Sequence, residues 1–181
     1  MQVPILENDI VLLSPLTIKN YNNLFEVASE KDLVQYSPSF IDTEDYLKKY
    51  TQTALSHFNN KTAIPFIIFD KRVKKHAGST RYMNIDWTNK VLEIGSTWIG
   101  SPFQGTGLNA NVKNLMINYA FEHMNFEKIE FRIDERNMRS RRAVEKLGGI
   151  LEGILRKNVY LKNEYKRNTC CYGILKEEWE N

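Results

Sequence analysis

QGTGLN, residues Gln104 to Asn109, lies between an expected strand and a long expected helix. A loop in this position can turn consecutive backbone N–H groups outward, and the helix adds unpaired N–H groups and a partial positive charge. Gly105 and Gly107 let the backbone approach a ligand closely and adopt unusual dihedral angles. The stretch therefore predicts an anion site suited to a diphosphate. It lacks the P-loop lysine pattern, which disfavours hydrolysis of nucleoside triphosphates.

Before the loop, the pattern predicts three successive strands with short links, which favours an antiparallel meander. These strands span residues 63–69, 77–85 and 91–99. A first strand is expected at 10–16. Two helices should follow it, one at 18–29 that Thr17 caps, and one from Asp42 or Thr43 to about Phe58.

After the loop, an apolar stripe at helical spacing predicts a long helix, through Leu108, Val112, Leu115, Met116, Tyr119 and His123. The remaining elements are a strand at 128–133, a helix at 137–147 that Gly148 and Gly149 end, and strands at 150–161 and 165–175. The predicted order is β-α-α-β-β-β-α-β-α-β-β, an α/β fold of the α+β kind with a mixed sheet. Residues 91–133 should form its one parallel crossover.

The composition fits a water-soluble globular protein, with 42% apolar and 26% charged residues among 181. No linker or repeat divides the sequence, so residues 1–181 are predicted to form a single domain. Cys170 and Cys171 are neighbours and poorly placed to pair, which favours a reducing compartment. We find no signal peptide and no apolar stretch long enough to cross a membrane, so we expect a cytoplasmic protein.

Two kinds of loop have this glycine pattern. The dinucleotide fingerprint G-x-G-x-x-G/A is satisfied by Gly105, Gly107 and Ala110, but it opens the first βαβ unit of a doubly wound sheet. Here several strands come first, and too few parallel units remain for such a sheet. The loop resembles more closely the acyl-CoA loop of GNAT superfamily N-acetyltransferases, R/Q-x-x-G-x-G/A, at Gln104 and Gly107, with Asn109 replacing the last small residue.

The resemblance extends to other segments of the chain. Residues 137–140 (NMRS) and 145–148 (EKLG) resemble the family's second CoA element, N-x-x-S followed by E-K-L-G. Residues 93–95 (EIG) and 98–102 (WIGSP) resemble its fourth strand. The element order matches GNAT topology over nearly the whole chain. The branch most similar is that of the ribosomal-protein alanine N-acetyltransferases and related amine acetyltransferases.

This resemblance implies acetyl-CoA as co-substrate and no metal. The pyrophosphate would lie on the backbone of residues 104–109, and the pantetheine arm would pair with the strand edge near Trp98 and Ile99. The implied cofactor-binding residues are Trp98, Ile99, Gln104, Gly105, Thr106, Gly107, Leu108, Asn109, Asn137, Ser140 and Lys146.

Two residues are candidates for catalysis. Glu93, on the strand before the loop, would deprotonate the acceptor amine directly or through a water. The alternative is a surface carboxylate on that strand. Many family members place a tyrosine near the leaving thiolate, but the matching position here is Val144. The branch implies Ser140 as its substitute, donating a hydrogen bond to the thiolate. The alternative is plain helix capping, with Asn137 as N-cap and Ser140 in the first turn.

Other reactive residues are assigned structural roles. The basic run Arg136, Arg139, Arg141, Arg142 and Lys146 is mostly a solvated helix face, although one or more members could meet a CoA phosphate. His57, His76 and His123 lack metal-ligand spacing, and His123 is expected to be packed. Cys170 and Cys171 are expected to be buried thiols, although an acyl-cysteine is conceivable.

The predicted function is transfer of an acetyl group from acetyl-CoA to a primary amine, by direct attack in a ternary complex. The acceptor is a peptide N-terminus or a small amine, such as a polyamine or an antibiotic. A non-catalytic module that binds acyl-CoA is the alternative. A net charge of +3 argues against nucleic acid as a partner, no membrane is expected, and a homodimer is the default assembly.

Overall fold

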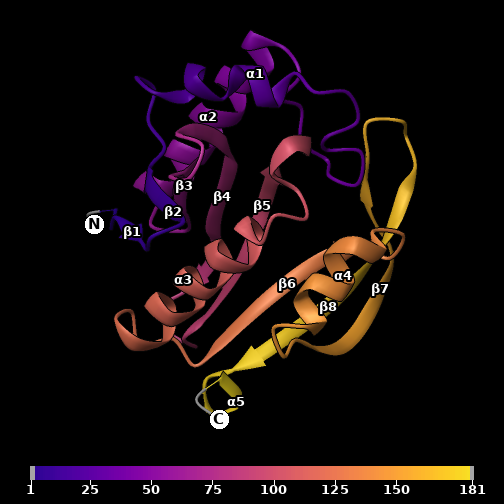
Figure 1. Cartoon of the computed structure of the whole chain (residues 1–181). Helices are drawn as coiled ribbons and strands as arrows, with labels where there is room; N and C mark the ends of the chain where they lie inside the picture. Colours follow the sequence, from indigo (N-terminus) through magenta and orange to yellow (C-terminus); the bar gives the residue numbers. More distant parts are fainter. Residues whose placement is uncertain (1–2, 180–181) are drawn as a thin grey trace.

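The computed structural model describes residues 3–179 and places eight strands in one mixed sheet. The sheet order is β1-β2-β3-β4-β5-β6-β8-β7 (Figure 1). The strands are β1 (Leu6–Glu7), β2 (Val11–Pro15), β3 (Ile64–Asp70), β4 (Lys75–Asp86), β5 (Val91–Ile99), β6 (Lys128–Asp134), β7 (Ile150–Tyr160) and β8 (Lys166–Leu175). The helices are η1 (Tyr21–Leu24), α1 (Phe25–Ala28), α2 (Glu44–Asn59), η2 (Ser101–Phe103), α3 (Leu108–Glu122), α4 (Met138–Glu145) and α5 (Lys176–Trp179).

Most of the predicted order is confirmed. Strands β3, β4 and β5 form the expected antiparallel meander, and β5, α3 and β6 form the one parallel crossover. Helix α2 begins at Thr43, whose hydroxyl accepts a hydrogen bond from the Tyr46 amide. The sequence pattern missed the two-residue strand β1 and the short helix α5, because elements this short show no periodicity.

The predicted helix at residues 18–29 is wrong. The chain forms only the 3₁₀ turn η1 and the single turn α1. The Asn20 side chain accepts from the Thr17 amide at 2.8 Å and donates to the Pro15 carbonyl at 2.9 Å, which makes a turn. An asparagine that bonds to nearby backbone in this way competes with helix formation.

The helices cover the two faces of the sheet separately. On one face, the indole of Trp98 donates to the hydroxyl of Tyr50 on α2. On the other, Tyr82 donates to the Met116 carbonyl of α3, and Arg141 of α4 donates to Tyr172 of β8. Figure 1 shows α3 and α4 lying in front of the sheet. The apolar core fills both spaces and excludes water from the centre of the sheet.

The sheet opens between β5 and β6. These strands pair at only three positions, Val91–Glu93 against Lys128–Glu130, and then diverge (Figure 1). The pairing of β5 with β4 shifts register between Ser79 and Arg81, and Ser96 takes a φ of 48° there. Such a bulge bends its strand. It therefore turns the last part of β5 away from β6 and leaves that edge free to pair.

Candidate active site

Glu93 lies where the opening between β5 and β6 begins. It is the last β5 residue paired with β6, and it is 6% exposed. Asn84 donates to its carboxylate at 2.8 Å, and the Arg132 guanidinium lies 3.6 Å away. Burial raises the pKa of Glu93, while Asn84 and Arg132 act against that rise. The alternative of a surface carboxylate is therefore wrong.

The loop after β5 presents free amides, as predicted. Gly105 and Gly107 have φ values of 76° and 83°, a left-handed conformation that favours glycine. Among the hydrogen bonds of residues 3–179, none uses the amides of Gly105, Thr106, Gly107, Asn109 or Ala110 as donors. Leu108 is fully buried and anchors the first turn of α3. The geometry fits a polyphosphate at the positive end of a helix.

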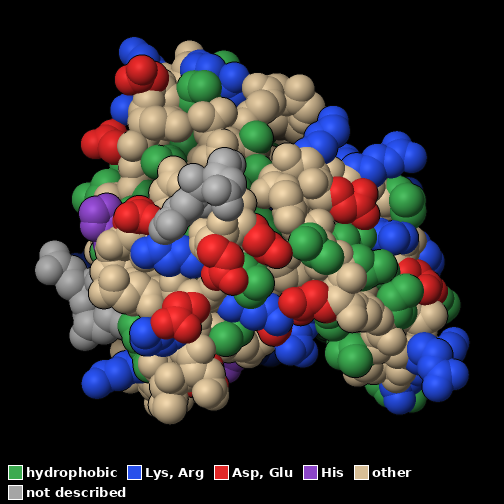
Figure 2. Space-filling model, turned by 90° about the horizontal axis from the view of Figure 1, so that it is seen from below, with side chains coloured by type: hydrophobic (Ala, Val, Ile, Leu, Met, Phe, Trp, Pro, Cys, Tyr) green, Lys and Arg blue, Asp and Glu red, His purple; other side chains and the backbone are tan. Residues whose placement is uncertain are grey.

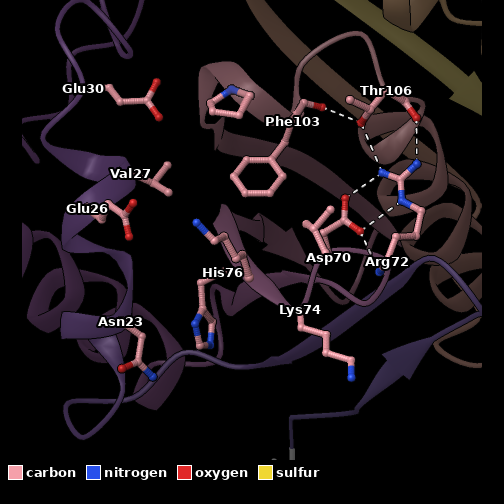
Figure 3. A pocket seen from close by; sticks show the side chains of 13 residues that line it. Asn23, Glu26, Val27, Glu30, Asp70, Arg72, Lys74, His76, Phe103 and Thr106 are labelled. Atoms are coloured by element: carbon pink, nitrogen blue, oxygen red, sulfur yellow. Dashed lines mark hydrogen bonds and ion pairs between the residues drawn. The ribbon is translucent and has the colours of Figure 1, made fainter.

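Arg72 holds the loop from the β3–β4 turn, a role that no sequence pattern indicates. Its guanidinium is bidentate to Asp70 and also donates to the carbonyl and hydroxyl of Thr106, at 3.0 and 3.2 Å. The Thr106 hydroxyl in turn donates to the Phe103 carbonyl. Figure 3 shows this chain of contacts. The Arg72 hydrogen bond, opposed by burial, lowers the pKa of Asp70, so the pair stays charged at neutral pH.

A cavity of about 660 Å³ lies behind the loop. Figure 3 shows its walls, with Glu26 of α1 and Glu30 just after α1 on the side opposite Phe103, and His76 lower in the view. Its lining residues come from η1, α1 and the segment just after it, the facing ends of β3 and β4 with their turn, η2 and Thr106, and those described include none from β6. The cavity is therefore separate from the opening that holds Glu93.

Gln104 joins the loop to the two elements beside it. The side-chain Nε2 of Gln104 donates to the Ile99 carbonyl at 2.7 Å, and its side-chain Oε1 accepts from the Arg139 guanidinium of α4. Arg139, from the basic run, therefore lies beside the loop. This contact brings the N-terminus of α4, with Asn137 and Ser140, next to the start of α3.

The structure separates capping from any other role of Ser140. The Asn137 side chain accepts from the Ser140 amide at 3.2 Å and caps α4, as predicted. The Ser140 hydroxyl takes part in no hydrogen bond within residues 3–179. Capping therefore does not account for the hydroxyl, which stays free for a ligand.

Trp98 and Ile99 expose their main chain, and not their side chains, at the open edge of β5. Both are buried, and both lie on the part of β5 that does not pair with β6. The Trp98 indole packs against Tyr50, whose ring also lies 4.5 Å from the Arg81 guanidinium. Burial opposes ionisation of Tyr50, but the Arg81 charge and the hydrogen bonds from Ser96 and Trp98 lower its pKa overall. No motif in the sequence indicates Tyr50 as a site residue.

Several predicted residues lie away from the opening. Lys146 is exposed at the C-terminal end of α4, about 10 Å along the helix from Arg139. Its contact with a CoA phosphate stays a prediction. Arg136 pairs with Asp134 instead of facing a ligand.

The histidine and cysteine assignments are partly corrected. His123 is exposed at the end of α3 and stacks on Tyr119, so its predicted packing is wrong. Cys170 is buried and Cys171 is half-buried, and both are free thiols. Burial raises the pKa of each thiol, which leaves them poor nucleophiles.

Features that would indicate a metal site, a membrane span or a nucleic-acid surface were sought in the residues that the structure describes. Within residues 3–179, no group of three or more His, Cys, Asp and Glu side chains is placed to hold a metal ion. No helix in the described part of the chain has the length and apolarity to cross a membrane. Figure 2 shows basic and acidic side chains interspersed on the face seen from below, without the broad basic area that nucleic acid needs.

Comparison with known proteins identifies the class. The model of the acetyltransferase (GNAT) domain matches residues 11–150, and the chain belongs to this family. "Putative ribosomal N-acetyltransferase YdaF" of Bacillus subtilis is 33% identical over 54% of this chain and 52% of that protein. "Uncharacterized N-acetyltransferase YnaD" of the same organism is 25% identical over 93% of this chain and 95% of that protein.

Solved structures agree with this family. A GCN5-related N-acetyltransferase from Brucella melitensis superposes with a TM-score of 0.89 at 26% identity, covering 99% of this chain and 82% of that one. The similarity to YdaF agrees with the ribosomal-protein branch expected from the sequence.

Proposed function

We propose that this protein transfers an acetyl group from acetyl-CoA to a primary amine. The observation that carries the proposal is the set of free loop amides described above, which lies beside an unpaired β5 edge that leads to the buried Glu93. A diphosphate on the loop and a peptide-like arm along the edge would bring a thioester to that carboxylate.

Each part of the loop has a role in holding the nucleotide end. The amides of Gly105 to Ala110 would bind the diphosphate, and Gln104 and Arg139 would hold the loop against α4. The backbone at Trp98 and Ile99 would pair with the pantetheine amides, as an added strand does. The side chains of both residues are buried, so this pairing does not depend on their identity.

The chemistry needs a neutral amine and a stabilised leaving group. An ordinary lysine amine has a pKa of about 10.4 and an α-amine about 8, so either must lose a proton before it attacks. Glu93 would take that proton. The thiolate would accept a hydrogen bond from the free hydroxyl of Ser140 at the N-terminus of α4.

The acceptor class comes from the family rather than from a signature in this chain. The similarity to YdaF, which is named a putative ribosomal N-acetyltransferase, favours the N-terminus of a ribosomal protein as the acceptor. A small amine is the second candidate. The competing function is a non-catalytic module that binds acyl-CoA. Two departures from the family pattern favour it: Asn109 replaces the last small residue of the loop, and Val144 replaces the tyrosine. The buried carboxylate in the opening favours the enzyme, because binding alone does not need it.

Two measurements test the function. Acetyl-CoA should raise the melting temperature of the protein, whereas NAD and NADP should leave it unchanged. Release of free thiol should then require both acetyl-CoA and an amine, from a panel of N-terminal peptides of ribosomal proteins, polyamines and aminoglycosides. Stabilisation by acetyl-CoA without thiol release on any amine would establish the non-catalytic module instead.

Replacing Ser140 by alanine should lower kcat by about tenfold, because one hydrogen bond to the developing thiolate is lost. The cap uses the backbone amide of Ser140, so helix α4 and the melting temperature should be unchanged. Steady-state kinetics and thermal unfolding check both statements. The matched variant Ser101→Ala removes another exposed hydroxyl, one that donates to Glu30, and should keep full kcat. An S140A enzyme with wild-type kcat would leave Ser140 with capping only.

A further inference from the structure

A lysine on α3 is buried in the sheet opening and is not explained by the proposed reaction. Lys113 is 6% exposed and belongs to the buried stripe of α3. Lysine is almost never buried without a partner, because its charge loses the solvation of water. Among the ion pairs of residues 3–179, none includes Lys113.

The amine lies between the two diverging strands. Its nitrogen is 2.7 Å from the hydroxyl of Thr97 on β5 and 5.7 Å from the ring centroid of Phe131 on β6. Both residues lie beyond the last paired position, Glu93–Glu130. The Lys113 nitrogen therefore reaches the opening from the α3 side.

The hydrogen bonds around Thr97 leave N–H donors of the Lys113 ammonium without an acceptor among the described residues. The Thr80 and Thr97 hydroxyls lie 2.7 Å apart and either can donate to the other, because each has a further acceptor in reach, the Met116 sulfur for Thr80 and the Gly95 carbonyl for Thr97. In either arrangement the Thr97 hydroxyl accepts from Lys113. An ammonium has three N–H donors, and this arrangement uses one of them. Burial lowers the pKa of Lys113 to about 7, and the Glu93 carboxylate compensates only in part.

We propose that Lys113 is a catalytic residue that donates a hydrogen bond to the carbonyl oxygen of the bound thioester. The proposal rests on the acetyl transfer proposed above. As the amine nitrogen bonds to the thioester carbon, negative charge develops on that oxygen, and the free N–H groups of Lys113 stabilise it. The carbon–sulfur bond then breaks and the thiolate leaves. Glu93 has taken the first proton from the ammonium group before the attack, the second proton that the nitrogen loses as the amide forms passes to the departing thiolate, and Lys113 keeps its own protons throughout.

The buried Lys113 lowers the stability of the fold, and a catalytic role explains why a lysine occupies this position. A methionine would fill the same space among the apolar residues of α3 without losing solvation. Residues that stabilise a transition state often reduce the stability of the folded protein. Activity and stability should therefore respond in opposite directions when the charge is removed.

The test compares Lys113→Met with the wild type. We expect kcat to fall about 10²-fold, the KM for acetyl-CoA to change less than threefold and the melting temperature to stay equal or rise. The variant Lys113→Gln keeps N–H donors without charge, and its kcat should lie between the two. Lys90→Met, at an exposed lysine in the turn before β5, is the matched control and should keep full kcat.

The outcomes separate this inference from the proposed function. If the wild type binds acetyl-CoA but acetylates no amine, the proposed function fails and the catalytic role of Lys113 fails with it. If the wild type is active and folded K113M or K113Q keeps its kcat, Lys113 is not catalytic. If K113M does not fold, K113Q decides, because it retains a polar group for Thr97. A rise in the KM for acetyl-CoA with an unchanged kcat would make Lys113 a binding residue and not a catalytic one.

Discussion

Replacing Glu93 by glutamine should lower kcat for the amine by about 10³-fold. Glutamine keeps the shape of the side chain and an oxygen that can accept the 2.8 Å hydrogen bond from Asn84. It cannot take a proton from the acceptor amine. Steady-state kinetics with a saturating amine would measure the loss, and the KM for acetyl-CoA should change little because Glu93 lies away from the diphosphate loop.

The pH dependence of kcat provides a second measure of the same residue. Burial raises the pKa of Glu93, so the wild-type rate should fall on the acid side at a higher pH than an ordinary glutamate would give. E93Q should lack this limb. The ionisation of the amine itself adds a limb nearer pH 8 for an α-amine, and that limb should remain in both enzymes.

Stability should move differently from activity in E93Q. A carboxyl whose folded pKa is raised stabilises the fold when it is protonated, below its unfolded pKa. That contribution is lost as the pH rises through the folded pKa. At neutral pH the ionised Glu93 therefore weakens the fold, and E93Q should melt at the same temperature or higher.

Glu130 is the matched control for Glu93. It is the partner of Glu93 across the β5–β6 pair and is half-buried. E130Q should keep kcat within a few fold and shift the acid limb to lower pH, because the Glu130 charge raises the pKa of Glu93. Equal losses in E130Q and E93Q would mean that the strand carries general negative charge and no specific base.

The sequence predicted the elements that have strong periodicity or punctuation. The meander, the crossover, the capped helix α2 and the Asn137 cap all follow from short-range patterns, and the structure confirms them. The prediction of a helix at 18–29 was wrong because the Asn20 side chain makes local hydrogen bonds with the backbone before it. A spacing of apolar residues does not report such competition.

The α3 stripe shows why part of the site was missed. Of the predicted stripe, Leu108, Val112 and Met116 are buried, but Leu115, Tyr119 and His123 are not. The other buried residues are Lys113, Ile117, Ala120 and Phe121. The stripe is rotated around the helix. The rotation leaves His123 exposed and turns Lys113 into the sheet opening. An apolar criterion excludes a lysine by definition, so periodicity could not have found it.

Arg72, Arg139 and Tyr50 depend on contacts between distant segments. Arg72 lies 34 residues from Thr106, and Arg139 lies 35 residues from Gln104. Each meets its partner only because the sheet brings the β3–β4 turn, the loop and α4 to one end of the fold. One sequence contains no record of such pairs. In the sequence alone, an arginine such as Arg72 cannot be distinguished from a solvated surface residue.

Replacing Gly107 by alanine should weaken acetyl-CoA binding by about 10²-fold while kcat at saturation stays near that of the wild type. Gly107 has a φ of 83°, and a Cβ built there meets nothing within 4 Å in the free protein. The substitution is therefore accepted sterically, and the left-handed dihedral costs about 1–2 kcal/mol of stability. The added methyl group would occupy space that the diphosphate needs, or the loop would relax and turn its amides inward. Isothermal titration with acetyl-CoA measures the effect.

Gly148 supplies the matched control for this dihedral cost. It has a φ of 90° at the end of α4, and a Cβ there also meets nothing within 4 Å. Its amide donates to the Glu145 carbonyl, so its place is to end the helix. Gly148 is the last residue of the EKLG segment, but its amide is used within the end of α4, so G148A should lose a similar amount of stability and keep wild-type affinity for acetyl-CoA. If G107A and G148A weaken binding equally, the loss reflects a less stable fold, and the loop amides do not hold the diphosphate. If G107A alone loses affinity, the space in front of the loop is where the phosphates lie.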